Sequence, residues 1–413
     1  MNIFVYPPAH AFGMKTLFQS TQREIAACGV QWDLAARVGE TPQGEYAFAH
    51  LYSLPDVYST FQNLLAARRA GLRVIATALY WNPTRYLTEG LAQAELSHAD
   101  ATAEREAKIR AAQLESERAL LRVIYHACDV LIALSPSEAD ALVNDFGIAR
   151  ERIVIAWSGV ETRYAQASPK LFHEKFGLRD FVLCVGRVDA NKNQLNLIRA
   201  LRDENVTLVL AGGSLAPHYL ELCKRNAGAN VHFLPSLSEA ELASAYAAAH
   251  THALVSWLEV IGLVTLEAAV AGCNIALTRE HGARDYVGEA GAYCDAGDVE
   301  SIRRAVLQAQ RAPRQTKLRE HLLETYSWSQ HARTIADAYA YAQTLPPPER
   351  DDTTFGEYEE AIRAFTALVP LLQNARDELW RDKMDIAAQR DAYANGRVMR
   401  VLNQLARLVK RGA

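Results

Sequence analysis

The stretch from Trp257 to Ala276 constrains the fold more than any other part of this chain. It follows a short apolar run at residues 252–255 that suits a buried parallel strand, and Gly262 opens a segment of good helix formers that ends near Gly272. The expected order is strand, loop, helix and strand. In such a unit the loop lies at the carboxyl edge of a parallel sheet, where the helix start presents unpaired amide groups and a partial positive charge.

Two carboxylates bracket this helix start, with Glu259 before it and Glu267 about a turn inside it. On a continuous helix they would lie roughly 12 Å apart, so one ligand reaches both only if the loop folds Glu259 back over the helix end. Phosphate binds well at a helix start, and carboxylates accept hydrogen bonds from hydroxyl groups. The expected ligand has a phosphate in the middle and hydroxyls at both ends, as a nucleotide sugar has. For the Glu pair alone, a solvated amphipathic helix is the simpler interpretation.

Strand and helix patterns alternate twice along the chain, which argues for two parallel sheets covered by helices on both faces. We therefore predict an α/β chain of two doubly wound, Rossmann-like domains, at residues 1–162 and 163–325, with a ligand cleft between them. A cross-over helix over residues 326–345 follows, and we expect it to pack back on the first domain. The strands are expected at residues 3–6, 31–34, 46–54, 73–78, 129–135 and 153–156 of the first domain, and at 181–187, 206–211, 231–234, 252–255 and about 274–276 of the second.

Two cations follow the first strand of the second domain, on the sheet edge that carries the Glu259 loop. Arg187 offers a guanidinium fork for phosphate oxygens, and Lys192 adds a point charge. Together they would hold a diphosphate without a metal, and the sequence has no Asp-x-Asp motif that would favour a metal site. Each cation in isolation reads more simply as a solvated loop residue.

Composition excludes several classes of protein. The formal net charge of -4 gives no sign of the positive charge that is typical of nucleic-acid-binding proteins. Six widely spread cysteines, without zinc-like spacing, indicate reduced thiols in a cytoplasmic protein. The N-terminus lacks the pattern of a signal peptide, and no charge-free apolar run is long enough to span a membrane. We expect a cytoplasmic protein, with peripheral attachment to the inner face of the membrane left open.

Several motifs in a fixed order resemble the retaining GT-B glycosyltransferases of family GT4, the glycosyl transferases group 1. The resemblance covers roughly residues 1–345, and the first domain agrees with it at 129–137, 152–155 and 159–161. The order and spacing of the motifs make it far more specific than any one of them. The motifs of the second domain are Gly186-Arg187, Lys192-Asn193, Gly212-Gly213, Glu259 with seven residues before Glu267, and Gly262-Leu263 between the two.

The resemblance implies a retaining transfer of sugar from a nucleotide-sugar donor to a glycan or lipid-linked acceptor, with no metal or cofactor. Residues 1–162 would face the acceptor and residues 163–325 would bind the donor. Arg187 and Lys192 would bind the donor diphosphate, Glu259 the hydroxyls of the transferred sugar, and Glu267 the ribose. The remaining donor-binding positions are Gly13, Gly186, Gly212, Val260, Ile261, Gly262 and Leu263.

The chain departs from the family pattern on the acceptor side. The glycine pair usual after the first strand is reduced to Phe12-Gly13, and the expected histidine after the strand that ends at Ala78 is missing, with Tyr80 nearby. His10 and Tyr80 are therefore the acceptor-side candidates. At the first carboxylate, the usual Glu-Gly-Phe-Gly becomes Glu259-Val260-Ile261-Gly262, and the missing glycine restricts the loop.

A separate tail is predicted at residues 351–413, after the proline run 346–348. Its last helix has an apolar stripe beside basic residues, which suits either an anionic membrane surface or a helix-packing seam that joins two copies. Three alternatives to transfer remain open at this point: a phosphorylase, a nucleotide-sugar epimerase, and a catalytically inactive GT-B scaffold held in an assembly by this tail. The paired carboxylates and cations favour transfer, since a scaffold has no need of them.

Overall fold

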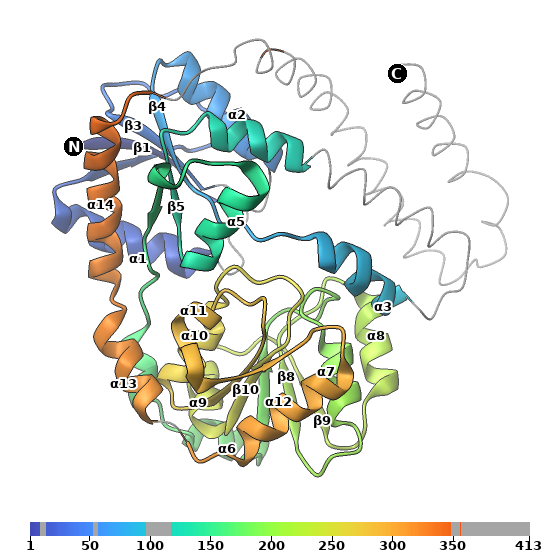
Figure 1. The fold of residues 1–413 in the computed structure, drawn as a ribbon. Helices are drawn as coiled ribbons and strands as arrows, with labels where there is room; N and C mark the ends of the chain where they lie inside the picture. The colour runs from blue at the N-terminus through green and yellow to red at the C-terminus, as the bar shows by residue number, and fades with distance from the viewer. Residues whose placement is uncertain (9–13, 53–56, 96–116, 315, 348–355, 357–413) are drawn as a thin grey trace, which may run out of the picture. The chain divides into compact units, whose positions relative to one another are not determined.

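Two six-stranded parallel sheets form the framework of the chain in the computed structural model (Figure 1). The structure describes residues 1–8, 14–52, 57–95, 117–314, 316–347 and 356. The first sheet comes from the chain before residue 156 and the second from the chain after residue 181. This arrangement confirms the predicted fold class of two doubly wound domains.

The first sheet has the order β2-β1-β3-β4-β5-β6. Every residue of the inner strands β3 and β5 is buried, as expected for strands covered on both faces. The chain is also helical at residues 117–126. The strands are β1 (Asn2–Tyr6), β2 (Gln31–Leu34), β3 (Phe48–Tyr52), β4 (Arg73–Thr77), β5 (Val130–Ala133) and β6 (Ile153–Ile155), and the helices around them are α1 (Lys15–Ile25), α2 (Val57–Arg69), α3 (Leu91–Glu95) and α5 (Pro136–Phe146).

The second sheet has the order β12-β11-β10-β7-β8-β9. The chain starts at β7 in the middle, builds outward through β8 and β9, and then returns to the other side of β7 with β10. This reversal is the topological switch point, where doubly wound folds bind ligands beyond the carboxyl ends of the strands. The strands are β7 (Val182–Val185), β8 (Leu208–Ala211), β9 (Val231–Leu234), β10 (Thr251–Leu254), β11 (Asn274–Thr278) and β12 (Gly291–Cys294).

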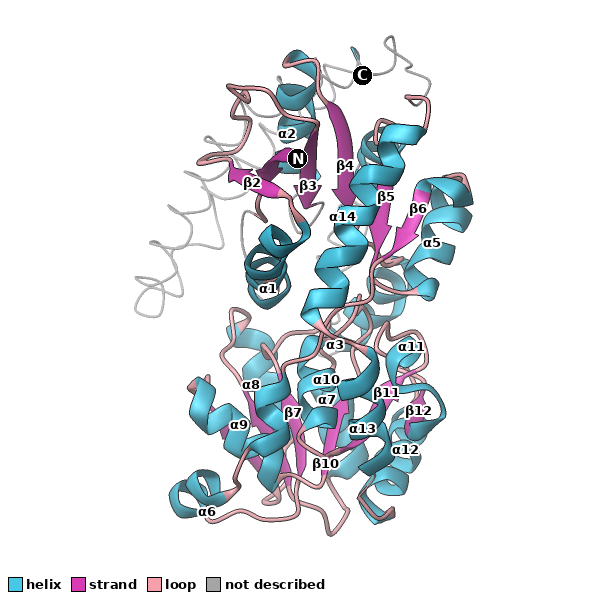
Figure 2. Cartoon of the chain, turned by 90° about the vertical axis from the view of Figure 1, so that its left-hand side faces the viewer, coloured by secondary structure: helices cyan, strands magenta, loops and turns pink. Residues whose placement is uncertain are grey.

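Helices cover both faces of this second sheet (Figure 2). Helix α10 fills the strand-loop-helix-strand unit expected around Glu259, because it follows β10 and leads into β11. The helices are α6 (Lys170–Phe176), α7 (Gln194–Leu201), α8 (Pro217–Asn226), α9 (Glu239–Ala248), α10 (Leu263–Val270), α11 (Arg284–Val287), α12 (Val299–Arg311) and α13 (Thr316–Thr325).

Helix α14 (Trp328–Thr344) leaves the second domain and packs beside α1 on the first (Figure 2). Its buried Tyr339 lies against the first sheet, where its hydroxyl is 2.6 Å from His50 Nδ1 and accepts a bond of 3.2 Å from Trp32 Nε1. Arg73 at the start of β4 donates to the carbonyl oxygen of Ala342. The last helix therefore joins the two domains through specific polar contacts.

The charged segment of residues 84–125 is described only at its two ends. A short π-helix (Tyr86–Gly90) leads into α3, and residues 96–116 lie outside the described part. The predicted tail at 351–413 also lies outside it, apart from Gly356. Within the described ranges, no helix combines the length and the apolar character needed to cross a bilayer.

Candidate functional site

The ends of β7 and β8 approach each other so closely that only glycine fits there. Gly212 has a φ of 153°, and a Cβ on it would lie 2.1 Å from the carbonyl oxygen of Gly186. Gly186 itself has a φ of 147°, a conformation that disfavours L side chains. The two predicted glycines thus allow the ends of β7 and β8 to approach each other at the switch point.

Hydrogen bonds join the loop after β7 to the loop after β10. Asn193 adopts a left-handed conformation with a φ of 60°, which Asn tolerates better than most residues. Its side-chain amide donates to the carbonyl oxygens of Val255 at 3.0 Å and Ala296 at 2.9 Å. The amide of Trp257 donates to the carbonyl of Asn191 at 2.8 Å. These bonds fix Lys192 between the two loops.

Lys192 and Glu259 form a largely buried ion pair between these loops. Ser256 Oγ donates to the same carboxylate at 3.4 Å. Burial alone would raise the pKa of Glu259, but Lys192 and His281 more than offset it and hold that pKa below its ordinary value. Glu259 is therefore an ionised acceptor of hydrogen bonds in this state.

The Glu259 loop folds back over the start of α10, as a shared ligand site requires. Gly262 precedes the helix in a left-handed conformation with a φ of 66°, and a Cβ on it would lie 3.0 Å from Glu259 Cγ. Gly282 is pressed against the same loop, since a Cβ there would lie 1.5 Å from the carbonyl oxygen of Val260. Ile261 is buried, while Val260 and Leu263 are half-buried.

Glu267 lies inside α10 and is 9% exposed. Its Oε2 accepts a 2.9 Å hydrogen bond from the hydroxyl of Tyr246 on α9. Burial raises the pKa of Glu267 to about 7, although the Tyr246 bond and the charge of Arg163 act in the opposite direction. A carboxyl that titrates near neutral pH and is not engaged in a strong ion pair is typical of functional sites.

Arg187 lines a cavity of about 390 Å³ beside this site. Its guanidinium is half-exposed and lies 3.4 Å from Asp189 Oδ2, and its carbonyl accepts a 2.8 Å bond from Gln194 Nε2. The guanidinium is therefore paired with Asp189 but still half-exposed. The other lining residues are Val185, Gly186, Ala211, Gly212, Gly213, Ser214, Leu215, Ser236, Leu237 and Leu242.

His281 also belongs to this site, although sequence reasoning missed it. Its Nδ1 accepts a 3.0 Å bond from the amide of Ala283, so the neutral ring carries its proton on Nε2. Nε2 is buried without a hydrogen-bond partner among the described residues. Burial lowers the pKa of His281 to about 4, with Glu259 opposing and Lys192 adding to the shift. A single histidine after a strand has no spacing partner that would have revealed it.

Of the two acceptor-side candidates, Tyr80 and His10, the structure describes only Tyr80. Tyr80 is 3% exposed, and its hydroxyl donates to Asp145 at 2.7 Å inside the first domain. Its ring packs on Phe146, which leaves the phenol no surface toward the cleft. His10 and Gly13 lie outside the described residues. Among the residues that are described, no group of His, Cys, Asp and Glu is arranged to hold a metal ion.

Known proteins resemble this chain in sequence and in fold. Residues 171–325 match the family described as Glycosyl transferases group 1. Mannosylfructose-phosphate synthase of Agrobacterium fabrum is 27% identical over 38% of this chain and 39% of its own length. D-inositol 3-phosphate glycosyltransferase of Streptosporangium roseum is 28% identical over 53% of this chain and 56% of its own length. The chain thus matches little more than half, or less, of these curated relatives.

The fold as a whole matches solved structures. Sucrose-phosphate synthase from Thermosynechococcus elongatus superposes with a TM-score of 0.62 at 15% identity, over 82% of this chain and 98% of that chain. This likeness extends across both domains, whereas the family match covers the second. The predicted resemblance to the GT-B group 1 glycosyltransferases is therefore confirmed.

Proposed function

Since residues 171–325 have the sequence of a glycosyl transferases group 1 domain in a chain with the GT-B fold, we propose that this protein transfers a sugar from a nucleoside-diphosphate sugar to a hydroxyl group of an acceptor. One observation carries the proposal. Lys192 and Glu259 form a largely buried ion pair between the loops after β7 and β10, and Glu267 lies inside α10, the helix that follows the second of these loops. A diphosphate with hydroxyls on both sides matches this set of cations and carboxylates.

The cations would act on the leaving group. Sugar transfer develops negative charge on the departing phosphate, and positive groups fixed there stabilise the transition state more than the ground state. Lys192 is held by Glu259 in this state. When the donor binds, its phosphate would compete for the ammonium of Lys192 and its sugar hydroxyls would donate to Glu259. Each partner of the buried pair would then keep a counterpart, which avoids the cost of an unpaired buried charge.

Glu267 would bind the ribose of the donor. Tyr246 occupies Oε2, so Oε1 is the oxygen available to accept from a ribose hydroxyl. The 390 Å³ cavity continues past Gly186 and Gly212 to Ser236 and Leu237, and we assign the nucleoside to it. Base recognition there would rest on the backbone, because the lining side chains offer few polar groups.

We extend the proposal to transfer with retention and without a metal. Glu259 is occupied by Lys192 and would be occupied by sugar hydroxyls, which suits it poorly to act as a covalent nucleophile. The acceptor oxygen would bond to the anomeric carbon as the bond from that carbon to the phosphate oxygen breaks. The acceptor proton would pass to that departing oxygen on the same face. A role in bacterial surface polysaccharide or glycolipid synthesis is part of the proposal and rests on the family resemblance alone.

Calorimetric titration with UDP, GDP, ADP, dTDP and CDP in the presence of a chelator tests the donor site. We expect one nucleotide to bind, and Glu267→Ala to weaken it by about 1–3 kcal/mol, the cost of a lost partner in a buried site. Glu289→Ala is the matched control, because Glu289 is exposed on the second domain. Binding that requires a divalent ion would contradict the metal-free assignment. No binding by any of the five, either with the chelator or with a divalent ion added, would favour an inactive scaffold.

A further inference from the structure

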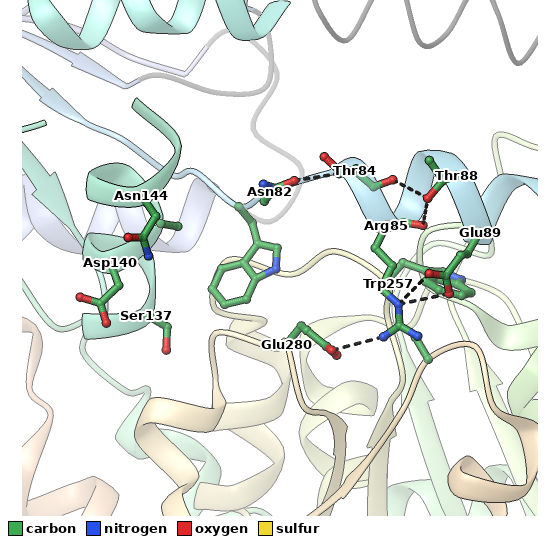
Figure 3. Close-up of a pocket in the computed structure, with 13 residues that line it drawn as sticks. Asn82, Thr84, Arg85, Thr88, Glu89, Ser137, Asp140, Asn144, Trp257 and Glu280 are labelled. Carbon is green, nitrogen blue, oxygen red and sulfur yellow. Dashed lines mark hydrogen bonds and ion pairs between the residues drawn. The ribbon is translucent and has the colours of Figure 1, made fainter. Parts of the chain in front are cut away.

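A second cavity, of about 590 Å³, lies between the two domains (Figure 3). The first domain contributes the segment after β4 and one face of α5, and the second contributes the loops after β10, β11 and β12. Its volume lies within the range of pockets that enclose small-molecule ligands. The lining residues are Trp81, Asn82, Thr84, Arg85, Thr88, Glu89, Ser137, Asp140, Ala141, Asn144, Trp257, Glu280 and Ala296.

The charges of this cavity disfavour an anionic ligand. Its described lining holds three carboxylates, Glu89, Asp140 and Glu280, against one cation, Arg85. Arg85 is already shared, at 3.2 Å from both Glu89 and Glu280 and 2.5 Å from Asp295 of the second domain. A phosphate in the cavity would therefore face an excess of negative charge, because the guanidinium that would neutralise it is paired.

Two polar side chains that line this cavity have no hydrogen-bond partner among the described residues. Asp140 and Asn144 lie one turn apart on α5, so their side chains share a face of the helix. Both are exposed and line the cavity, and no described residue bonds to either side chain. Together they offer carboxylate and amide oxygens as acceptors and an amide as a donor.

An aromatic side chain also lines the cavity. Trp81 is half-buried and belongs to the segment after β4. An indole presents a large apolar face, and a pyranose ring combines an apolar C–H face with a rim of hydroxyls. A tryptophan that lines the same cavity as a carboxylate and an amide therefore fits an uncharged sugar. Trp257 does not share this role, because it is 6% exposed and the Arg85 guanidinium lies 5.5 Å from the centre of its ring.

The cavity adjoins the candidate donor site. Trp257 is two residues before Glu259, and Glu280 precedes His281. We propose that this cavity binds an uncharged saccharide as the acceptor, with Trp81 stacking on its ring and Asp140 and Asn144 binding its hydroxyls. This inference rests on the proposed function and adds the chemical class of the acceptor. It also moves the acceptor contact from Tyr80 to its neighbour Trp81.

Saturation-transfer NMR on the full chain tests the assignment, with and without the nucleoside diphosphate found by calorimetry. The probes are the methyl glycosides of glucose, galactose, mannose and N-acetylglucosamine, and the 6-phosphates of the same sugars. We expect at least one neutral glycoside to bind better than its phosphorylated counterpart. Trp81→Ala should abolish the signal and Trp81→Phe should keep it, while Asp140→Asn should weaken binding roughly tenfold, as the loss of a charge-assisted hydrogen bond predicts.

Two controls separate this inference from the proposed function. Asp203→Asn, at an exposed carboxylate of the second domain, should bind the glycoside as the wild type does. Nucleotide binding is measured on the same samples. If the nucleotide binds but sugar phosphates bind better than neutral glycosides, or Trp81→Ala binds as the wild type does, or no saccharide binds, the acceptor assignment is overturned and the donor site stands. A glycoside that binds where no nucleotide does would support the saccharide site and contradict the transferase.

Discussion

The hydroxyl of Tyr246 donates to Glu267 Oε2 over 2.9 Å, and the two residues come from different helices of the second domain. The bond fixes the rotamer of a carboxyl group that burial would otherwise leave without a partner. It also leaves Oε1 as the oxygen without a described partner, to which a ligand hydroxyl can donate. Tyr246 is in this sense a positioning residue for the ribose contact proposed here.

The affinity for the nucleoside diphosphate should rise with pH. The pKa of Glu267 is raised to about 7, so its carboxyl is mostly protonated at pH 6 and mostly ionised at pH 8. The ionised form is the better acceptor of ribose hydroxyls, and the fraction in that form scales the apparent affinity. We expect binding about tenfold tighter at pH 8 than at pH 6 by calorimetry. The phosphate titrates too, so Glu267→Gln is the reference, and an equal pH dependence in that variant would contradict the assignment.

Replacing Glu138 should destabilise the first domain without touching the donor site. Its buried carboxylate accepts from the backbone amides of Leu134 at 2.7 Å and Tyr80 at 2.8 Å. Glu138→Ala leaves both amides without a partner, and each should cost about 1–3 kcal/mol. Urea denaturation measures the loss. Asp140→Ala on the exposed face of the same helix should stay within about 0.5 kcal/mol of wild type, and equal effects would rule out this role for Glu138.

Tyr339→Phe should loosen the helix that joins the domains. The hydroxyl of Tyr339 bonds with Trp32 and His50 in the buried interface, and its removal leaves two polar groups unsatisfied. We expect a loss of about 1–3 kcal/mol in the free energy of unfolding, measured by thermal or urea denaturation. Tyr341→Phe removes a hydroxyl from an exposed residue of the same helix, and it should change stability little. A similar loss in both variants would show that the buried contacts contribute nothing specific.

The two sheets could be predicted from the sequence more completely than the site. Strands such as β5 and β7 are buried along their whole length, and this burial appears in the sequence as continuous apolar runs between helical patterns. The positions of Arg187, Lys192 and Glu259 followed from the same logic, because the carboxyl ends of parallel strands meet at one edge. The fold-back of Glu259 was foreseen as a condition and is met through Gly262.

Side-chain contacts between residues far apart in the sequence could not be predicted in this way. Tyr246 and Glu267 are 21 residues apart, on helices whose relative rotation depends on the packing of the whole domain. Tyr80 was chosen for its place after β4, yet irregular backbone has no period that assigns its side chains to a face. In the structure Tyr80 turns inward to Asp145, and Trp81 lines the cavity instead.

Single and double substitutions of Lys192 and Glu259 should distinguish the contribution of Lys192 to catalysis from its contribution to stability. Lys192→Ala removes a fixed charge from the departing phosphate, and we expect a loss of about 10²–10³ in kcat, as for other preorganised charge contacts. It also leaves Glu259 ionised and largely buried, so the variant should be less stable than wild type. The double variant Lys192→Ala/Glu259→Gln removes that unpaired charge and should regain stability while staying inactive.

The outcome is measured by urea denaturation and by transfer kinetics on the same preparations. Lys224→Ala is the control, since Lys224 pairs with Glu221 on the exposed face of α8 and should affect neither quantity. Stability that does not recover in the double variant would mean that Lys192 acts through packing and not through its charge. Activity that recovers together with stability would show that the loss in Lys192→Ala came from a damaged fold, and would remove Lys192 from the proposed stabilisation of the leaving group.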